Sequence, residues 1–190
     1  MKHFPHLAIV TAGALIAVFG LLRHNAARAE PQTGTASESA PPDAAARAAR
    51  KLMDEVGTAR FTSAGFRPGT VRHMVMFRLR PDVTATQRAT VINGFRDLVK
   101  LSKRPDGTPV IQSLETGIQD SGEGADQGLE LGFLVTFRSQ GDRNFYVGTP
   151  TVTDPAFFDP AHERYKERVA PFLKQAVVFD FPVDATSAPK

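Results

Sequence analysis

The sequence contains no cysteine and no tryptophan. Without cysteine the chain cannot form a disulfide framework, a thiolate nucleophile, a cysteine-ligated metal site or a covalent c-type haem. It also lacks net charge beyond its first segment. The first 29 residues hold Lys2, Arg23 and Arg28 and no acid, so the other 161 of the 190 residues carry 20 basic and 20 acidic groups. A protein that binds nucleic acid by neutralising phosphates is therefore not expected.

The N-terminus has the pattern of an export signal. An uncharged run at residues 7–22 follows a short, weakly basic start and precedes Ala27-Arg28-Ala29, a small-x-small cleavage pattern. This predicts a signal peptide over residues 1–29, cleaved before Glu30, and a periplasmic or secreted mature protein. An uncleaved anchor is the alternative, but a membrane-spanning helix usually needs roughly 20 apolar residues.

Composition divides the mature chain into a tether, one domain and a tail. Residues 30–69 are rich in Ala, Pro and Ser and are predicted to form a tether. A short helix is expected within it at residues 43–56, with Asp43 as N-cap and Gly57 at its end. Residues 70–184 form the predicted domain, and residues 185–190 are a C-terminal tail.

From residue 71 onward the pattern indicates four strands and two main helices. In residues 71–80, His73, Val75 and Phe77 share one face of a strand, and Met74 and Met76 share the other. Apolar spacing and turn signals predict further strands at 110–116, 129–138 and 177–181, helices at 84–102 and 160–175, and a short helix at 142–147. The order β-α-β-β-α-β predicts an α+β, ferredoxin-like protomer, with a four-stranded antiparallel sheet and both main helices on one face.

The other face of this sheet needs a cover. It is predicted to carry three apolar residues and three arginines, namely Met74, Met76, Leu134, Arg72, Arg78 and Arg80. A homodimer that packs sheet against sheet would supply the missing layer, giving a dimeric α/β barrel. The arginines could instead bind an acidic ligand, although edge charges and salt bridges between subunits explain such residues more often.

Two histidines, His73 and His162, remain after removal of the first 29 residues. Asp159-Pro160-Ala161-His162 has the form of a helix start, with Asp159 as N-cap and Pro160 at the first helical position. At about 100° per residue, His162 lies on the buried stripe of that helix and faces the sheet. Burial and a helix N-terminus both lower the pKa of a histidine, so we predict a neutral His162 near pH 7.

Between sheet and helices, these histidines are predicted to meet a pocket with aromatic walls formed by Phe77, Phe133 and Phe179. Tyr146 is expected to place its hydroxyl at the pocket mouth. Each polar residue also has a structural interpretation, since buried histidines bonded to a carbonyl or a carboxylate and tyrosines packed at helix ends are common. A metal site with two histidines and a carboxylate is a further alternative, without support from local ligand spacing.

Three segments together resemble one known family. Arg72-His73-Met74-Val75-Met76-Phe77-Arg78-Leu79 resembles the opening strand of the stress-responsive dimeric α/β-barrel (Dabb) family. Asp159-Pro160-Ala161-His162 resembles its Pro-Ala-His motif at a helix start, and Ala176-Val177-Val178-Phe179-Asp180-Phe181 resembles its closing strand. The resemblance covers about residues 70–183 and implies a ferredoxin-like protomer that dimerises sheet to sheet.

The family includes plant stress proteins and a polyketide cyclase that closes an aromatic ring by aldol condensation. Resemblance to that cyclase implies that His162 is the base that removes a proton from a carbon next to a carbonyl, and that His73 is the pocket histidine on the first strand. The cyclase's tyrosine corresponds to Tyr146 only across an extra stretch, residues 148–158.

Two functions follow from these residues and this resemblance. The first is an exported domain that binds a small, largely apolar ligand without catalysis, its histidines being packing residues. The second is a cyclase- or lyase-like enzyme with His162 as general base and His73 orienting the substrate. Fold resemblance does not choose between them. Neither requires a cofactor, nucleic acid or stable membrane insertion after signal cleavage, and both have the homodimer as partner.

Overall fold

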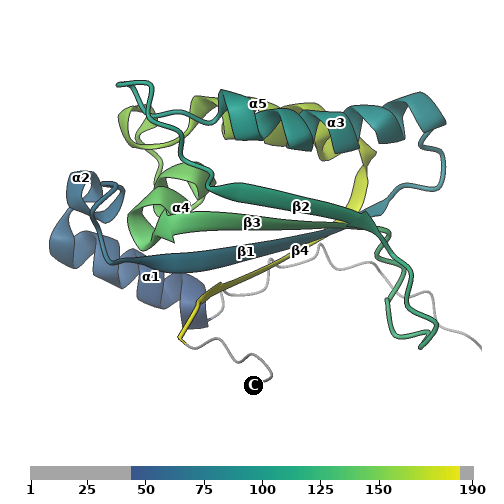
Figure 1. Ribbon diagram of the computed structural model, residues 1–190, viewed down its shortest axis with the longest axis horizontal. Helices are drawn as coiled ribbons and strands as arrows, with labels where there is room; N and C mark the ends of the chain where they lie inside the picture. The colour runs from purple at the N-terminus through teal and green to yellow at the C-terminus, as the bar shows by residue number, and fades with distance from the viewer. Residues whose placement is uncertain (1–43, 185–190) are drawn as a thin grey trace, which may run out of the picture. The chain divides into compact units, whose positions relative to one another are not determined.

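Four antiparallel strands form one sheet in the order β2-β3-β1-β4 in the computed structural model, which describes residues 44–184 (Figure 1). The strands are β1 (Pro68–Leu79), β2 (Ser113–Ile118), β3 (Leu131–Ser139) and β4 (Leu173–Pro182). The helices are α1 (Ala44–Val56), α2 (Thr58–Phe61), α3 (Ala85–Leu101), α4 (Gln140–Val147) and α5 (Pro160–Val169), with single 3-10 turns η1 (Pro155–Phe157) and η2 (Ala170–Phe172). The predicted α+β, ferredoxin-like fold is confirmed. The signal peptide, the cap Asp43 and the tail 185–190 lie outside the described residues.

Strand β1 shows why the sheet has two unlike faces. It lies at the centre of the sheet, paired with β3 on one side and β4 on the other. Val71, His73 and Val75 are buried, whereas the alternating Met74 and Met76 are half-buried. Because side chains alternate across a strand, these two sets point to opposite sides of the sheet. We call the side of His73 the closed face and the side of Met74 the open face.

Helices α3 and α5 run side by side and cover the closed face (Figure 1). Helix α3 begins where Thr84 forms a capping box with Gln87. Its buried residues Val91, Phe95 and Leu98 follow the helical spacing and pack on the strands. The main hydrophobic core is therefore the layer between α3, α5 and the closed face.

The prediction that α5 continues to residue 175 is wrong. The helix ends at Val169, and η2 follows it. Pro171 has no N–H to donate, so the hydrogen-bond ladder of the helix does not continue through it. Leu173 then starts β4 and pairs with Leu79 of β1. Residues 173–175, which the apolar pattern had assigned to the helix, are therefore part of strand β4.

The bounds of β2 and β3 also differ from the prediction. Val110 and Ile111 were expected to open β2, but they are buried in an irregular segment, and the Val110 amide donates to the Ser102 carbonyl at the end of α3 at 3.1 Å. Strand β2 begins at Ser113 and extends to Ile118, beyond the predicted end at 116. The apolar character of Val110 and Ile111 reflects core packing rather than strand pairing. The third strand, expected at 129–138, starts at Leu131 and ends at Ser139.

A second, smaller hydrophobic core lies beside the first. It consists of Phe61, Phe66 and Val152, with one side of α1 and the aromatic residues Phe157 and Phe158 packed against it. The region 44–66, predicted as part of a tether, is helical over most of its length and packs on this core through one side of α1 and through Phe61 and Phe66. Among residues 44–184, no helix is both long and apolar enough to cross a membrane.

Candidate functional site

His73, Tyr146 and His162 meet on the closed face, although they come from β1, α4 and α5. The Tyr146 ring lies parallel to the His162 ring, with centroids 3.9 Å apart and planes 15° apart. The His73 ring meets the Tyr146 ring edge-on, with centroids 5.7 Å apart. The structure therefore brings together the three residues that the sequence singled out, with the tyrosine in the middle.

His162 is held by the start of α5, as its sequence predicts. The Asp159 side chain caps the helix by accepting from the Ala161 amide, and Pro160 occupies the first turn. Nδ1 of His162 lies 2.7 Å from the Tyr146 carbonyl oxygen. Since a carbonyl only accepts, Nδ1 carries the proton and Nε2 keeps its lone pair.

The environment of His162 keeps its imidazole neutral. The residue is 8% exposed. Burial, supported by the nearby positive charge of Lys166, lowers the pKa of His162 to about 3. Within the described part of the chain, its Nε2 has no hydrogen-bonding partner, so this nitrogen is free to accept a proton or a hydrogen bond from a ligand.

The His73 side chain is held by Asp180 of the edge strand β4. It pairs with Asp180 across β1 and β4, and its Nδ1 lies 2.6 Å from Oδ1 of Asp180. Arg143 of α4 donates to the other oxygen of the same carboxylate at 2.5 Å. Burial opposes ionisation of Asp180, but the His73 and Arg143 interactions outweigh it and lower the pKa of this carboxyl. The result is a chain from Arg143 through Asp180 to His73 that sets the orientation of the ring.

Asp180 and Arg143 were missed by the sequence analysis. Asp180 alternates with Phe179 and Phe181, and the aromatic residues were taken as the buried side of the last strand. Register shows the reverse, because Asp180 pairs with His73 on the closed face and Phe179 pairs with Met74 on the open face. Asp180 could have been identified from the sequence as an acidic residue that pairs with an inward-facing histidine on the neighbouring strand.

Tyr146 has an unusual polar environment. Its side chain is fully buried, and its hydroxyl has no hydrogen-bonding partner among residues 44–184. Burial, followed by the negative charge of Asp159, raises the pKa of Tyr146, so the phenol is neutral and can donate. Tyr165, the other tyrosine, is also buried but donates to the Val91 carbonyl at 3.0 Å. The predicted position of the Tyr146 hydroxyl at a pocket mouth is wrong, since it lies inside the packed layer.

The three predicted aromatic walls do not surround this site together. Phe77 and Phe133 belong to the core beside α3, where the Phe133 ring stacks on Phe95 with centroids 4.0 Å apart. Phe179 lies on the open face and is 60% exposed. The aromatic residue beside the histidines is instead Phe137, whose ring centroid lies 5.1 Å from that of Tyr146.

A cavity of about 730 Å³ lies on the open face, across the sheet from the histidines. Its apolar lining includes Met74, Met76, Ile118, Leu134 and Val177, and Phe133 also borders it. The rings around Tyr146 are packed against one another. This cavity and the polar site are thus on different faces. In the described residues, no group of three or more His, Asp or Glu side chains could hold a metal ion.

Comparison with known proteins gives a family and a fold. The family model described as "Stress responsive A/B Barrel Domain" matches residues 71–183. No curated protein matches the chain.

Several solved structures are similar. The hydroxynitrile lyase from Passiflora edulis has 19% sequence identity and a TM-score of 0.50, over 64% of this chain and 99% of its own. A dimeric protein of unknown function with a ferredoxin-like fold from Bacteroides fragilis has 23% identity and a TM-score of 0.42, over 60% and 96%. A Dabb family protein from Mesorhizobium loti has 17% identity and a TM-score of 0.42, over 60% and 95%. At such identity the likeness to the lyase concerns the fold alone.

Proposed function

The chain belongs to the stress-responsive A/B barrel domain family, and from that premise we propose that it binds a small, largely apolar molecule at the His73–Tyr146–His162 site. The molecule carries an acceptor group, such as a carbonyl oxygen, which accepts a hydrogen bond from the Tyr146 hydroxyl. We further propose that the domain acts as a homodimer outside the cytoplasm.

The observation that carries this proposal is the unpartnered hydroxyl of Tyr146. Leaving a buried hydroxyl unpaired costs about 1–3 kcal/mol. A phenylalanine at this position would avoid that cost, and a packing role does not require the oxygen. A ligand acceptor within reach of the hydroxyl would recover the lost hydrogen bond.

The surroundings select for a ligand that is mainly apolar. The rings of Phe137, His73 and Tyr146 pack around this position and make it largely apolar. A second polar contact is available at Nε2 of His162, which can accept from a ligand hydroxyl or amine. The site therefore suits a compact molecule with one acceptor and one donor on an apolar body.

A second function, proton abstraction, is favoured by the pairing of an unprotonated nitrogen with a phenol. His162 Nε2 would form an N–H bond as a C–H bond next to the ligand carbonyl breaks, and the electron pair would pass to the carbonyl oxygen. Tyr146 would donate to that oxygen and stabilise the enolate. Since burial lowers the pKa of His162 to about 3, the imidazole is a weak base in this state, which ranks catalysis below binding.

The dimer proposal rests on the open face. Met74, Met76 and Leu134 are half-buried there, and the adjoining Phe179 is largely exposed. Apolar side chains gathered on one side of a sheet are stabilised when a second layer removes them from water. A second copy of the same face provides that layer. The proposed export rests on the sequence of residues 1–29, which lie outside the described region.

Titration with a panel of small aromatic ketones, followed by amide NMR of the mature protein, tests both functions. Binding at the site should shift the resonances of residues around Tyr146, and His162→Gln should weaken it at least severalfold. For catalysis, the bound ketone in D₂O should exchange the hydrogen next to its carbonyl, and His162→Gln should abolish this exchange. Shifts confined to Met74, Met76 and Leu134 would contradict the proposed site and assign the ligand to the open face.

A further inference from the structure

Two segments outside the four-stranded sheet, residues 44–66 and 148–158, pack on each other. Residues 44–66 precede the family match, which begins at residue 71. Residues 148–158 are the extra stretch between Tyr146 and the helix of His162. They meet in the second core, where Phe61 and Phe66 contribute from the first segment and Val152 from the other. Neither segment has a hydrophobic core of its own.

Helix α1 supplies the outer side of this core. Ala49, Leu52, Met53 and Val56 recur at helical spacing and pack on it from one side of the helix. Phe157 and Phe158 close it from the side of the extra stretch. The contacts are apolar and continuous, so α1 and the extra stretch are stabilised by the same buried surface.

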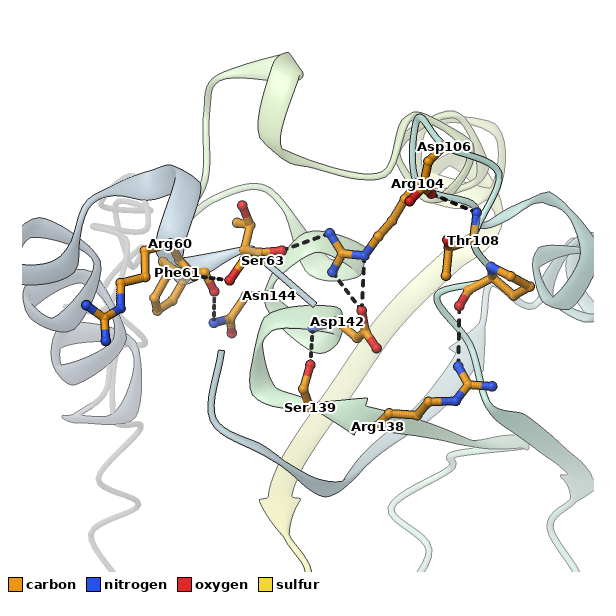
Figure 2. Close-up of polar contacts among 12 residues, drawn as sticks. Arg60, Phe61, Ser63, Arg104, Asp106, Thr108, Arg138, Ser139, Asp142 and Asn144 are labelled. Atoms are coloured by element: carbon orange, nitrogen blue, oxygen red, sulfur yellow. Dashed lines mark hydrogen bonds and ion pairs between the residues drawn. The ribbon is translucent and has the colours of Figure 1, made fainter. Parts of the chain in front are cut away.

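Polar contacts attach the same segment to α4. Asn144 of α4 donates from Nδ2 to the Phe61 carbonyl at 2.8 Å. Arg104 donates to the Thr62 carbonyl at 3.0 Å. Its guanidinium also donates to Asp142 of α4 at 2.6 Å (Figure 2), so it joins the two elements. These groups are buried or nearly so, which makes each hydrogen bond costly to lose.

One glycine shows how closely the segment approaches α4. A Cβ atom built on Gly141 would lie 1.7 Å from the Ser63 carbonyl oxygen. Only glycine permits this approach, and the Gly141 amide also donates to the Phe66 carbonyl at 3.0 Å. The backbone after α2 is therefore seated directly on the first turn of α4.

Both ends of the extra stretch lead to the candidate site. It starts at Gly148, whose backbone has a φ of 62° and whose added Cβ would lie 2.8 Å from Cβ of Phe158. It is followed directly by Asp159, whose amide donates to the Phe145 carbonyl at 2.9 Å and whose side chain caps the helix of His162. A shift of Phe158 in the second core would thus be passed to Tyr146 at one end and to His162 at the other.

We propose that α1 and α2 form a positioning segment of the His–Tyr site, which holds the extra stretch and α4 so that Tyr146 stays between the two histidines and away from water. Phe61 is its main positioning residue. The use of the site rests on the proposed function, but the coupling itself is a property of the fold and can be measured without a ligand.

Tyrosine fluorescence tests the coupling, because the chain has two tyrosines and no tryptophan. In a Tyr165→Phe background only Tyr146 emits, and quenching by acrylamide at neutral pH reports its access to solvent. Phe61→Ala should raise the quenching constant severalfold. Met53→Ala, a milder change on α1, should raise it less and serves if the Phe61 variant does not fold.

Leu98→Ala is the matched control, because Leu98 is buried like Phe61 but lies in the main core on α3. It should lower the melting temperature without raising the quenching constant of the folded protein. An unchanged quenching constant in folded Phe61→Ala, or an equal rise in Leu98→Ala, would overturn the proposal. Absence of any ketone binding would leave these outcomes intact and count only against the proposed function.

Discussion

The two faces of the sheet differ in packing and in polar contacts, although the same strands form both. On the closed face, β1 and β4 present His73 and Asp180, each with a defined polar partner, among tightly packed aromatic rings. On the open face, the adjacent pair Met74 and Phe179 is apolar and incompletely covered. The closed face therefore holds the packed core and the polar groups of the candidate site, whereas the open face carries the apolar surface on which the proposed dimer rests.

The largest expected effect separates the faces by stability. Phe95→Ala removes a ring that stacks on Phe133 in the closed-face core, so it should cost about 3–5 kcal/mol of the free energy of unfolding. Phe179→Ala on the open face should cost the monomer about 0.5 kcal/mol or less. Urea unfolding at low protein concentration measures both. Equal losses would contradict the distinction between the faces.

The second largest expected effect is a dependence of the free energy of unfolding on pH, caused by His162 on the closed face. Because the folded pKa of His162 is lowered from 6.5 to about 3, the unfolded chain binds a proton that the folded chain does not bind between these values. The stabilisation is complete above the unfolded pKa and is lost as pH falls from there toward about 3, with a limiting slope of about 1.4 kcal/mol per pH unit.

Urea unfolding across this pH range should show the slope in the parent protein and a shallower one in His162→Gln. The difference between the two proteins removes the contribution of carboxyl groups that titrate in the same range. Parallel curves would mean that the imidazole is not held neutral by burial.

A substitution on the open face should change the stability of the subunit less, but it should change the oligomeric state. Met74→Asp places a charge at its centre, so a sheet-to-sheet dimer should dissociate. Sedimentation of the mature chain at micromolar concentration should give a dimer for the parent and a monomer for the variant. A monomeric parent, or a variant that remains dimeric, would contradict this assignment of the open face.

Much of the fold could be predicted because local pattern and tertiary packing agree. The alternation around His73 in β1 and the apolar spacing that predicted a helix at 84–102 are short-range signals, and both strand and helix formed where they indicated. The end of α5 was missed because pairing of Leu173 with β1 is a long-range interaction that the apolar spacing does not contain.

The candidate site was only partly predictable for the same reason. The helix start at Asp159 placed His162 correctly, since a cap and a proline act within a few residues. The positions of Phe179 and Asp180 depended on the register of an edge strand, where a shift of one residue exchanges the two faces. The packing of Phe61 beside α4 joins residues about 80 positions apart, and no local pattern reports it.

The central claim is that Tyr146 keeps a buried hydroxyl for a ligand, and the smallest predicted effect tests it most directly. Tyr146→Phe removes an unpartnered oxygen, whereas Tyr165→Phe removes one that donates to the Val91 carbonyl. Measured by urea unfolding without ligand, Tyr165→Phe should cost about 1 kcal/mol, and Tyr146→Phe should cost nothing or stabilise the domain. A loss in Tyr146→Phe equal to that in Tyr165→Phe would show that the hydroxyl already has a partner within the fold and would contradict the account.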